Sequence, residues 1–243
     1  YRALEIERLA AFFQSFRSSL SALAGQGSTR VGLLTPGPFN ETYFEHAYLA
    51  RYLGFLLVEG EDLKIVDDRV HLRTVSGLMP IDVLVRRLDS DFADPLELNI
   101  ASRIGVPGLV RAIKAGHVAL ANALGTGVVE SRALMSFTPA IQRHLHGEDL
   151  IAPNVATWWC GQKRERDLVL ENLDDMVIAP AFGTTLPGVL NRGPVLGASL
   201  EGAERACVIQ ALEHRGADLV GQEVVRIGTT PVWEDGVLTP RPM

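Results

Sequence analysis

The chain has 243 residues, of which 47% are hydrophobic and 21% are charged, a composition typical of a folded globular protein and not of a disordered chain. The formal net charge is −6, and the 23 basic residues form no cluster, which argues against nucleic-acid binding. No apolar run approaches the roughly 18 residues that a membrane-spanning helix needs, so we expect no membrane association and a cytoplasmic location.

The first part of the chain predicts a helix followed by a β-α-β unit. Apolar residues recur at helical spacing over 1–24, and a glycine-containing linker extends to residue 29. A strand at 30–35, a helix at 41–53 and a strand at 55–59 follow, with Asn40 as the expected N-cap and Gly54 as the helix stop. Such a unit implies a parallel sheet. A hairpin over 63–74, a helix over 107–115 and strands at 81–86 and 118–121 complete a Rossmann-like domain assigned to residues 30–150.

A second part of the chain begins near residues 148–153, where charged residues precede Pro153. Residues 130–146 before it are predicted to be helical. Residues 151–243 predict helices at 164–173 and 202–214, strands at 176–179 and 218–227, and an irregular segment to about residue 199. The fold class is therefore α/β. The helical pattern that starts at Tyr1, without a methionine, leads us to expect a chain cut from a longer protein.

The segment 35–46 is the first candidate site, because it follows a predicted parallel strand and opens a helix. Ligands of open α/β sheets bind at that edge, and a helix start offers free backbone N–H groups. Glu41 and Glu45 are four residues apart and would share a helix face. A capped helix with solvated acids is the alternative.

The segment 86–94 is the second candidate site, again just after a predicted strand. Asp89 and Asp91 would point to the same side of an extended chain, where they could hold Mg²⁺ or an ammonium group. Arg87 could bind a substrate carboxylate in a bidentate manner. The alternative is a surface network of arginine and aspartate that contributes little energy.

Other patterns are weaker. His144 and His146 lie two residues apart and point to different sides of a helix, which disfavours a shared metal ion. The glycines of 122–127 lack both the dinucleotide pattern and a Walker lysine.

Several segments together resemble the circularly permuted ATP-grasp type 2 family, related to glutathionylspermidine synthase. The similarity covers nearly the whole chain and rests on the order and spacing of LTPGPFNETYFEH (34–46), RRLDSDFADPL (86–96), GVPGL (105–109), NALGTGV (122–128), TWWCG (157–161) and QE (222–223) with TP (230–231).

This resemblance implies an ATP-dependent carboxylate–amine ligase that forms a peptide-type amide through an acyl phosphate, with part of an ATP-grasp fold in residues 151–243. It implies adenine between the two strands of that part, which have Ile178, Ala179, Gln222, Glu223, Val224 and Val225 as nucleotide-binding residues. It places a small-molecule or peptide substrate, with a carboxylate and an amine, against Asn40, Glu41, Tyr43, Glu45, His46 and Asp91, and gives catalytic roles to Arg87 and Asp89. Their roles would be positioning and charge stabilisation. ATP and Mg²⁺ are the implied cofactors, with the metal ligands expected outside this chain.

Two departures from the family pattern support a different class of function. The strand that holds a phosphate-binding lysine in many ATP-grasp relatives has Ala179 here, and the glycine-rich phosphate loop is replaced by residues 183–188. A degenerate ATP-grasp protein that acts as a non-catalytic binding module for a protein partner is therefore the alternative. A third hypothesis is a Rossmann-type nucleotide-binding protein with different chemistry.

Overall fold

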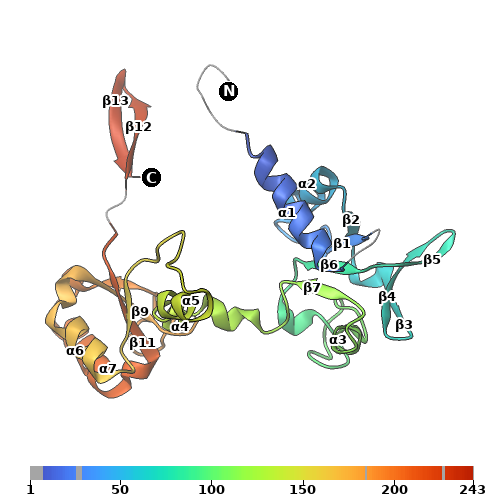
Figure 1. The fold of residues 1–243 in the computed structure, drawn as a ribbon. Helices are drawn as coiled ribbons and strands as arrows, with labels where there is room; N and C mark the ends of the chain where they lie inside the picture. Colours follow the sequence, from blue (N-terminus) through green and yellow to red (C-terminus); the bar gives the residue numbers. More distant parts are fainter. Residues whose placement is uncertain (1–7, 26–28, 184, 226–227, 243) are drawn as a thin grey trace. The chain divides into compact units, whose positions relative to one another are not determined.

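The computed structural model describes residues 8–25, 29–183, 185–225 and 228–242. The chain divides into two compact units, Tyr1–Thr126 and Gly127–Met243. Both contain sheets and helices (Figure 1), and the predicted mixed α/β class with a parallel sheet is confirmed. The division follows Thr126, earlier than the boundary expected near residues 148–153.

The sheet of the first unit is parallel, with the order β2-β1-β6-β7. Its strands are β1 (Val31–Leu34), β2 (Leu56–Val58), β6 (Val83–Arg86) and β7 (Ala119–Ala121). The predicted β-α-β unit is confirmed, since α2 (Tyr43–Leu53) joins β1 to the parallel neighbour β2 and ends at the left-handed Gly54. All four residues of β1 are buried, as expected for a strand covered on both faces.

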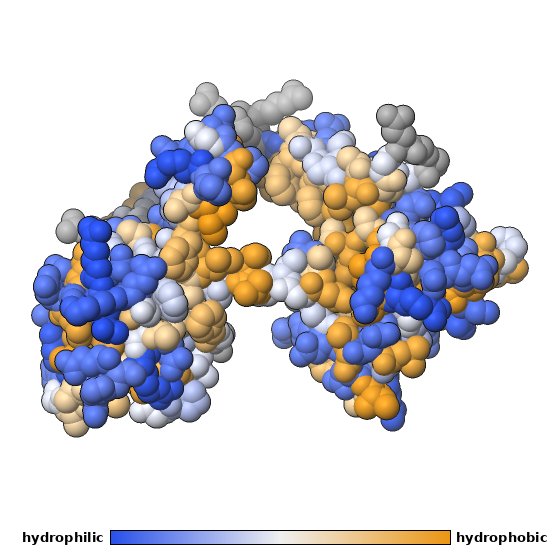
Figure 2. All heavy atoms as spheres, turned by 60° about the horizontal axis from the view of Figure 1, so that its bottom comes forward, coloured by the Kyte–Doolittle hydropathy of each residue, from blue (hydrophilic) through white to orange (hydrophobic). Residues whose placement is uncertain are grey.

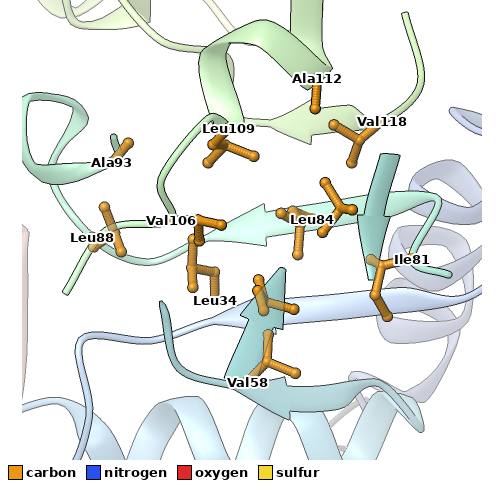
Figure 3. Packing of buried hydrophobic residues seen from close by; sticks show 12 residues of the cluster. Leu34, Val58, Ile81, Leu84, Leu88, Ala93, Val106, Leu109, Ala112 and Val118 are labelled. Carbon is orange, nitrogen blue, oxygen red and sulfur yellow. The ribbon is translucent and has the colours of Figure 1, made fainter. Parts of the chain in front are cut away.

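Two different sets of elements cover the faces of this sheet. Val31 and Leu33 pack with Leu20 of α1 (Ala10–Ala22) and Ala50 of α2. On the other face, Leu34, Val58 and Leu84 meet Leu109 and Ala112 of α3 (Leu109–Lys114), as Figure 3 shows. Also in this unit are an antiparallel sheet of β3 (Leu63–Val66), β4 (Arg69–Thr74) and β5 (Gly77–Pro80), and the 3-10 turns η2 (Gly60–Asp62) and η3 (Ser90–Phe92).

The second unit contains an antiparallel sheet with the order β10-β9-β11-β8. The strands are β8 (Thr157–Trp159), β9 (Met176–Pro180), β10 (Val195–Leu196) and β11 (Leu219–Glu223). On one face, Ile178 and Leu219 pack with α6 (Lys163–Glu171) and α7 (Gly202–Arg215). On the other, Ala179 and Val220 pack with Ala133 of α4 (Arg132–Met135).

The remaining elements of this unit are short. They are α5 (Thr138–His146), the hairpin of β12 (Thr229–Glu234) and β13 (Val237–Pro242), and the 3-10 turns η4 (Thr126–Glu130, which spans the division), η5 (Leu173–Asp175), η6 (Gly197–Ser199) and η7 (Gly216–Asp218).

Four expectations about these elements need correction. Thr42, not Asn40, occupies the N-cap position of α2, which begins two residues later than predicted. Residues 130–146, predicted to be helical, contain two helices, α4 and α5, and Pro139 lies in the first turn of α5, where a proline is tolerated. The sequence did not predict β5, β8 or the β12–β13 hairpin. The last predicted strand ends at Glu223, and Arg226 and Ile227 of that prediction lie outside the described residues.

The surface is mixed in character. The face in Figure 2 shows hydrophobic residues interspersed among hydrophilic ones in each unit. Large apolar side chains that are exposed include Phe39, Phe44, Val75, Ile100 and Ile151. Among the described helices, none combines the length and the apolar character that crossing a membrane requires.

Candidate functional site

The carboxyl edge of the parallel sheet gathers the ends of three strands. Thr35 follows β1, and its N–H donates to the carbonyl of Val58 at the end of β2 (2.9 Å). Arg87 follows β6, and its N–H donates to the carbonyl of Leu34 at the end of β1 (2.9 Å). The two sequence-predicted candidate segments therefore begin side by side at this edge, where open α/β sheets bind ligands.

A buried hydrogen-bond chain fixes the segment after β1. Thr35 and His46 are buried, and His46 Nδ1 lies 2.9 Å from Thr35 Oγ1, while Nε2 lies 3.0 Å from Thr42 Oγ1. Asn40 Oδ1 accepts from both the N–H and the hydroxyl of Thr42, at 2.9 Å and 2.6 Å.

These contacts determine the tautomer of the imidazole. The backbone N–H of Thr42 can only donate, so the Asn40 atom that it meets is the amide oxygen. The hydroxyl of Thr42 gives its hydrogen to that oxygen and therefore accepts from His46 Nε2–H. Nδ1 then carries no hydrogen and accepts from the hydroxyl of Thr35. With a neutral imidazole, every hydrogen bond from Thr35 to Asn40 has one donor and one acceptor.

The electrostatic environment also favours the neutral ring. Burial lowers the pKa of His46 below its usual value of 6.5, and the guanidinium of Arg87 lowers it further, while Glu45 acts in the opposite sense. His46 is thus a buried positioning group for the 35–42 segment, and its ring does not face solvent.

The other predicted substrate residues of this segment differ in exposure. Glu41 and Glu45 are exposed and Tyr43 is half-buried. Glu41 lies before the first residue of α2, so the helix-face argument for the two glutamates does not apply.

The segment after β6 is not extended. Ser90–Phe92 forms the turn η3, so the expected alternation that would align Asp89 with Asp91 is absent. Arg87, Asp89 and Asp91 are all exposed and form no ion pair with any residue that the structure describes.

Asp94, in contrast, is a structural residue. It is fully buried, and its carboxylate accepts from the N–H groups of Leu96 (2.9 Å), Gly108 (3.1 Å) and Val110 (3.0 Å). It therefore ties the loop after β6 to the start of α3.

The nucleotide-binding residues predicted on β9 and β11 have distinct surroundings. Ile178 and Ala179 are fully buried on opposite faces of the second sheet, and both belong to the β9–β11 ladder. The two strands are hydrogen-bonded neighbours, so no ligand fits between them.

The end of β11 is more open. Gln222 Nε2 donates to Thr157 Oγ1 (3.0 Å), and Glu223 Oε1 accepts from the N–H of Ala156 (3.2 Å). Val224 and Val225 are exposed beyond the strand.

Two cavities lie beside these residues within the second unit. One, of ≈400 Å³, has a mostly apolar lining that includes Ala156, Thr157 and Trp158. The other, of ≈530 Å³, is lined by the 127–132 segment and by Phe182 and Gly183, which follow β9. Met135 lines both cavities.

Arg132 is a functional candidate that sequence reasoning missed. It lines the ≈530 Å³ cavity, and its Nη1 donates to the carbonyl of Gly183 (3.2 Å). The N–H of the next residue, Ala133, donates to Ala181 (3.1 Å) and so fixes α4 against the end of β9. The sequence feature that could have indicated this arrangement is the small side chain of Ala179, which leaves room for α4 to pack on β9.

Metal ligation by the protein is not evident in the described ranges: no group of three or more histidine, cysteine, aspartate or glutamate residues there has a suitable arrangement.

Comparisons with known proteins give one family. The model of the circularly permuted ATP-grasp type 2 family matches residues 1–243. An uncharacterized protein of Mycobacterium tuberculosis is 37% identical over 222 residues, which cover 91% of this chain and 39% of that protein. An uncharacterized protein of Synechocystis sp. is 37% identical over 201 residues, or 83% of this chain and 41% of that protein. An uncharacterized protein of Mycobacterium leprae is 34% identical over 221 residues, which cover 91% of this chain and 38% of that protein. The chain thus spans about two fifths of the length of these relatives.

Proposed function

The chain belongs to the circularly permuted ATP-grasp type 2 family, and from this membership we propose that its second unit binds ATP and that the whole protein is an ATP-dependent carboxylate–amine ligase. Bound ATP would supply the phosphoryl group that activates a carboxylate as an acyl phosphate, which an amine then attacks to form an amide, the type of bond that glutathionylspermidine synthases form.

The paired cavities of the second unit support nucleotide binding. The apolar ≈400 Å³ cavity suits the adenine ring, with Thr157 in its wall and Gln222 bonded to Thr157. The neighbouring ≈530 Å³ cavity would take the phosphates, with Arg132 as the cation of a lining that also contains Glu130. A guanidinium is well matched to phosphate oxygens, which it can bind in a bidentate manner.

Arg132 is the observation on which the proposal depends. Ala179 offers no charge to a phosphate and is fully buried against α4. Arg132, on that same helix, brings a guanidinium to the loop that follows β9. This favours nucleotide binding over the alternative of a degenerate, non-catalytic module.

The substrate side would lie at the carboxyl edge of the first unit. Arg87 is exposed there and can hold a carboxylate, and Asp89 and Asp91 can attract an amine. Asn40 and His46 would act through the backbone that they position, and Glu41, Tyr43 and Glu45 would contact the substrate from the start of α2. Mg²⁺ would be held by groups outside this chain.

Thermal unfolding of the whole protein with and without MgATP tests the nucleotide site. A ligand that binds only the native state stabilises it by RT ln(1 + [L]/Kd), about 2.7 kcal/mol at a hundredfold excess over Kd. Arg132→Gln should raise the Kd for MgATP about tenfold or more, because a charge-assisted hydrogen bond is lost.

Arg164→Gln, which replaces an exposed arginine on α6, is the matched control and should leave the affinity for MgATP unchanged. No stabilisation of the wild-type protein at millimolar MgATP would reject the nucleotide site and favour the non-catalytic module. Equal affinities of the two variants would reject the role of Arg132.

A further inference from the structure

A small cavity of ≈130 Å³ lies at the carboxyl ends of β1 and β2 in the first unit. Three segments line it: residues 35–36 after β1, residues 59–61 after β2, and residues 103–104 of the long loop before α3. Its volume is well below the roughly 300–1,000 Å³ of sites for drug-sized ligands, so its ligand is small.

Close backbone packing sets the shape of this cavity. A Cβ atom on Gly60 would lie 2.5 Å from the carbonyl oxygen of Ile104, and one on Gly105 would lie 2.2 Å from that of Phe92. The loops therefore touch through glycines at both places. Thr35, which also lines the cavity, is bonded to His46. A cavity held in this way is largely pre-formed, which reduces the entropic cost of binding.

The lining contains groups of both charges. Glu59 and Glu61 provide carboxylates and Arg103 provides a guanidinium. None of the three forms an ion pair with another described residue, so they do not neutralise one another across the cavity.

The carboxylate of Glu59 is the most enclosed of these groups. It lies so close to Gly37 that a Cβ atom there would be 2.8 Å from Oε2. Burial raises the pKa of Glu59, and the neighbouring carboxylates of Asp62 and Glu61 raise it further. A bound cation would relieve this repulsion.

We propose that this cavity binds the head group of a free α-amino acid, with its ammonium group on Glu59 and Glu61 and its carboxylate on Arg103. An α-amino acid carries its two charges on one small unit, which matches a small cavity with separated, unpaired charges. A polyamine lacks the carboxylate, and a peptide carries its carboxylate far from its ammonium group. In the proposed ligase, this amino acid would be one of the two substrates. That role rests on the proposed function, whereas the binding itself does not require ATP.

Saturation-transfer NMR on the whole protein without nucleotide tests the binding, using a panel of the standard L-amino acids at millimolar concentration. At least one should bind. Its amide, which lacks the carboxylate, and its des-amino acid, which lacks the ammonium group, should each bind about tenfold or more weakly. Absence of binding by every amino acid, or equal binding of either analogue, would overturn the proposal.

Variants locate the site. Arg103 and Glu61 are exposed, so Arg103→Gln and Glu61→Gln should fold normally. Each variant should bind the amino acid about tenfold or more weakly. Arg73→Gln, an exposed arginine on β4, is the control and should bind as the wild type does. Unchanged affinity in both cavity variants would overturn the proposal. Because these measurements contain no ATP, failure of the nucleotide test leaves them interpretable, and the reverse also holds.

Discussion

His46 makes folding stability depend on pH, because the native state holds its ring neutral. Burial and Arg87 lower its pKa in the folded chain, while the unfolded chain titrates near 6.5. Below pH 6.5 the unfolded state binds more protons than the native state, so the free energy of unfolding falls as the pH is lowered. Above pH 6.5 this contribution to stability is fully retained. Each unit by which the pKa is lowered corresponds to about 1.36 kcal/mol.

Urea unfolding at about pH 7.5 and about pH 5.5, on either side of that value, measures this effect. His46→Gln should reduce the difference in stability between the two pH values. His144→Gln, at an exposed histidine of α5, should not. If both variants keep the wild-type pH dependence, His46 does not titrate as described.

Asp94 is expected to be essential for the stability of the first unit. Asp94→Ala would leave the N–H groups of Leu96, Gly108 and Val110 without their acceptor inside the protein. We expect a loss of about 3 kcal/mol or more in the free energy of unfolding. Asp91→Ala, at an exposed position of the same loop, should change it by less than about 0.5 kcal/mol. Similar denaturation midpoints for the two variants would contradict the structural role of Asp94.

For individual residues, the sequence predicted their location in the fold better than their roles. The order of strand, turn and helix indicated that residues 35–46 and 86–94 lie at one sheet edge. It did not distinguish the buried Asp94 from the exposed Asp89 and Asp91, since all three follow the same strand. The difference comes from η3, which turns the chain back toward α3.

Among the elements, the contact between η5 and η6 depends on Gly197. A Cβ atom at this position would lie 1.8 Å from the carbonyl oxygen of Leu173, so Gly197→Ala must displace one of the two backbones. We expect a loss of about 2 kcal/mol or more, measured by chemical denaturation. Gly228→Ala is the control, because no atom of the described residues, apart from those next to it in the chain, lies within 4 Å of its added Cβ. Equal free energies of unfolding for the two variants would contradict the dependence of this contact on Gly197.

Sequence patterns predicted the buried strands and the helix with a clear stop, and failed for elements that form only because they pair with a partner strand. The buried strands β1, β6 and β9 are short apolar runs between turns, and α2 has a clear glycine stop. β8 has only three residues and exists because it pairs with β11. β5 likewise contains Gly77 and Pro80, which argue against a strand, and it forms as the edge of a small sheet.

For the whole molecule, the sequence indicated two α/β parts but placed their boundary later than the division of the structure. Residues 132–146 follow the first sheet along the chain, yet Ala133 of α4 packs on Ala179 and Val220 of the second sheet. This contact joins residues far apart in the sequence, so a local sequence pattern does not predict it. Arg132 and the two cavities were missed for the same reason.

The two proposed sites belong to different units, so their ligands should protect different parts of the chain from hydrogen exchange. MgATP should slow exchange in the segments that line the paired cavities, around residues 127–135, 154–158 and 182–183. The amino acid should slow exchange around residues 59–61 and 103–104. Slowed exchange reports local opening that the ligand opposes, and mass spectrometry of peptides resolves it along the chain. Protection by MgATP confined to the first unit would contradict the assignment of the nucleotide to the second. Protection by the amino acid only outside residues 35–104 would contradict the small cavity as its site.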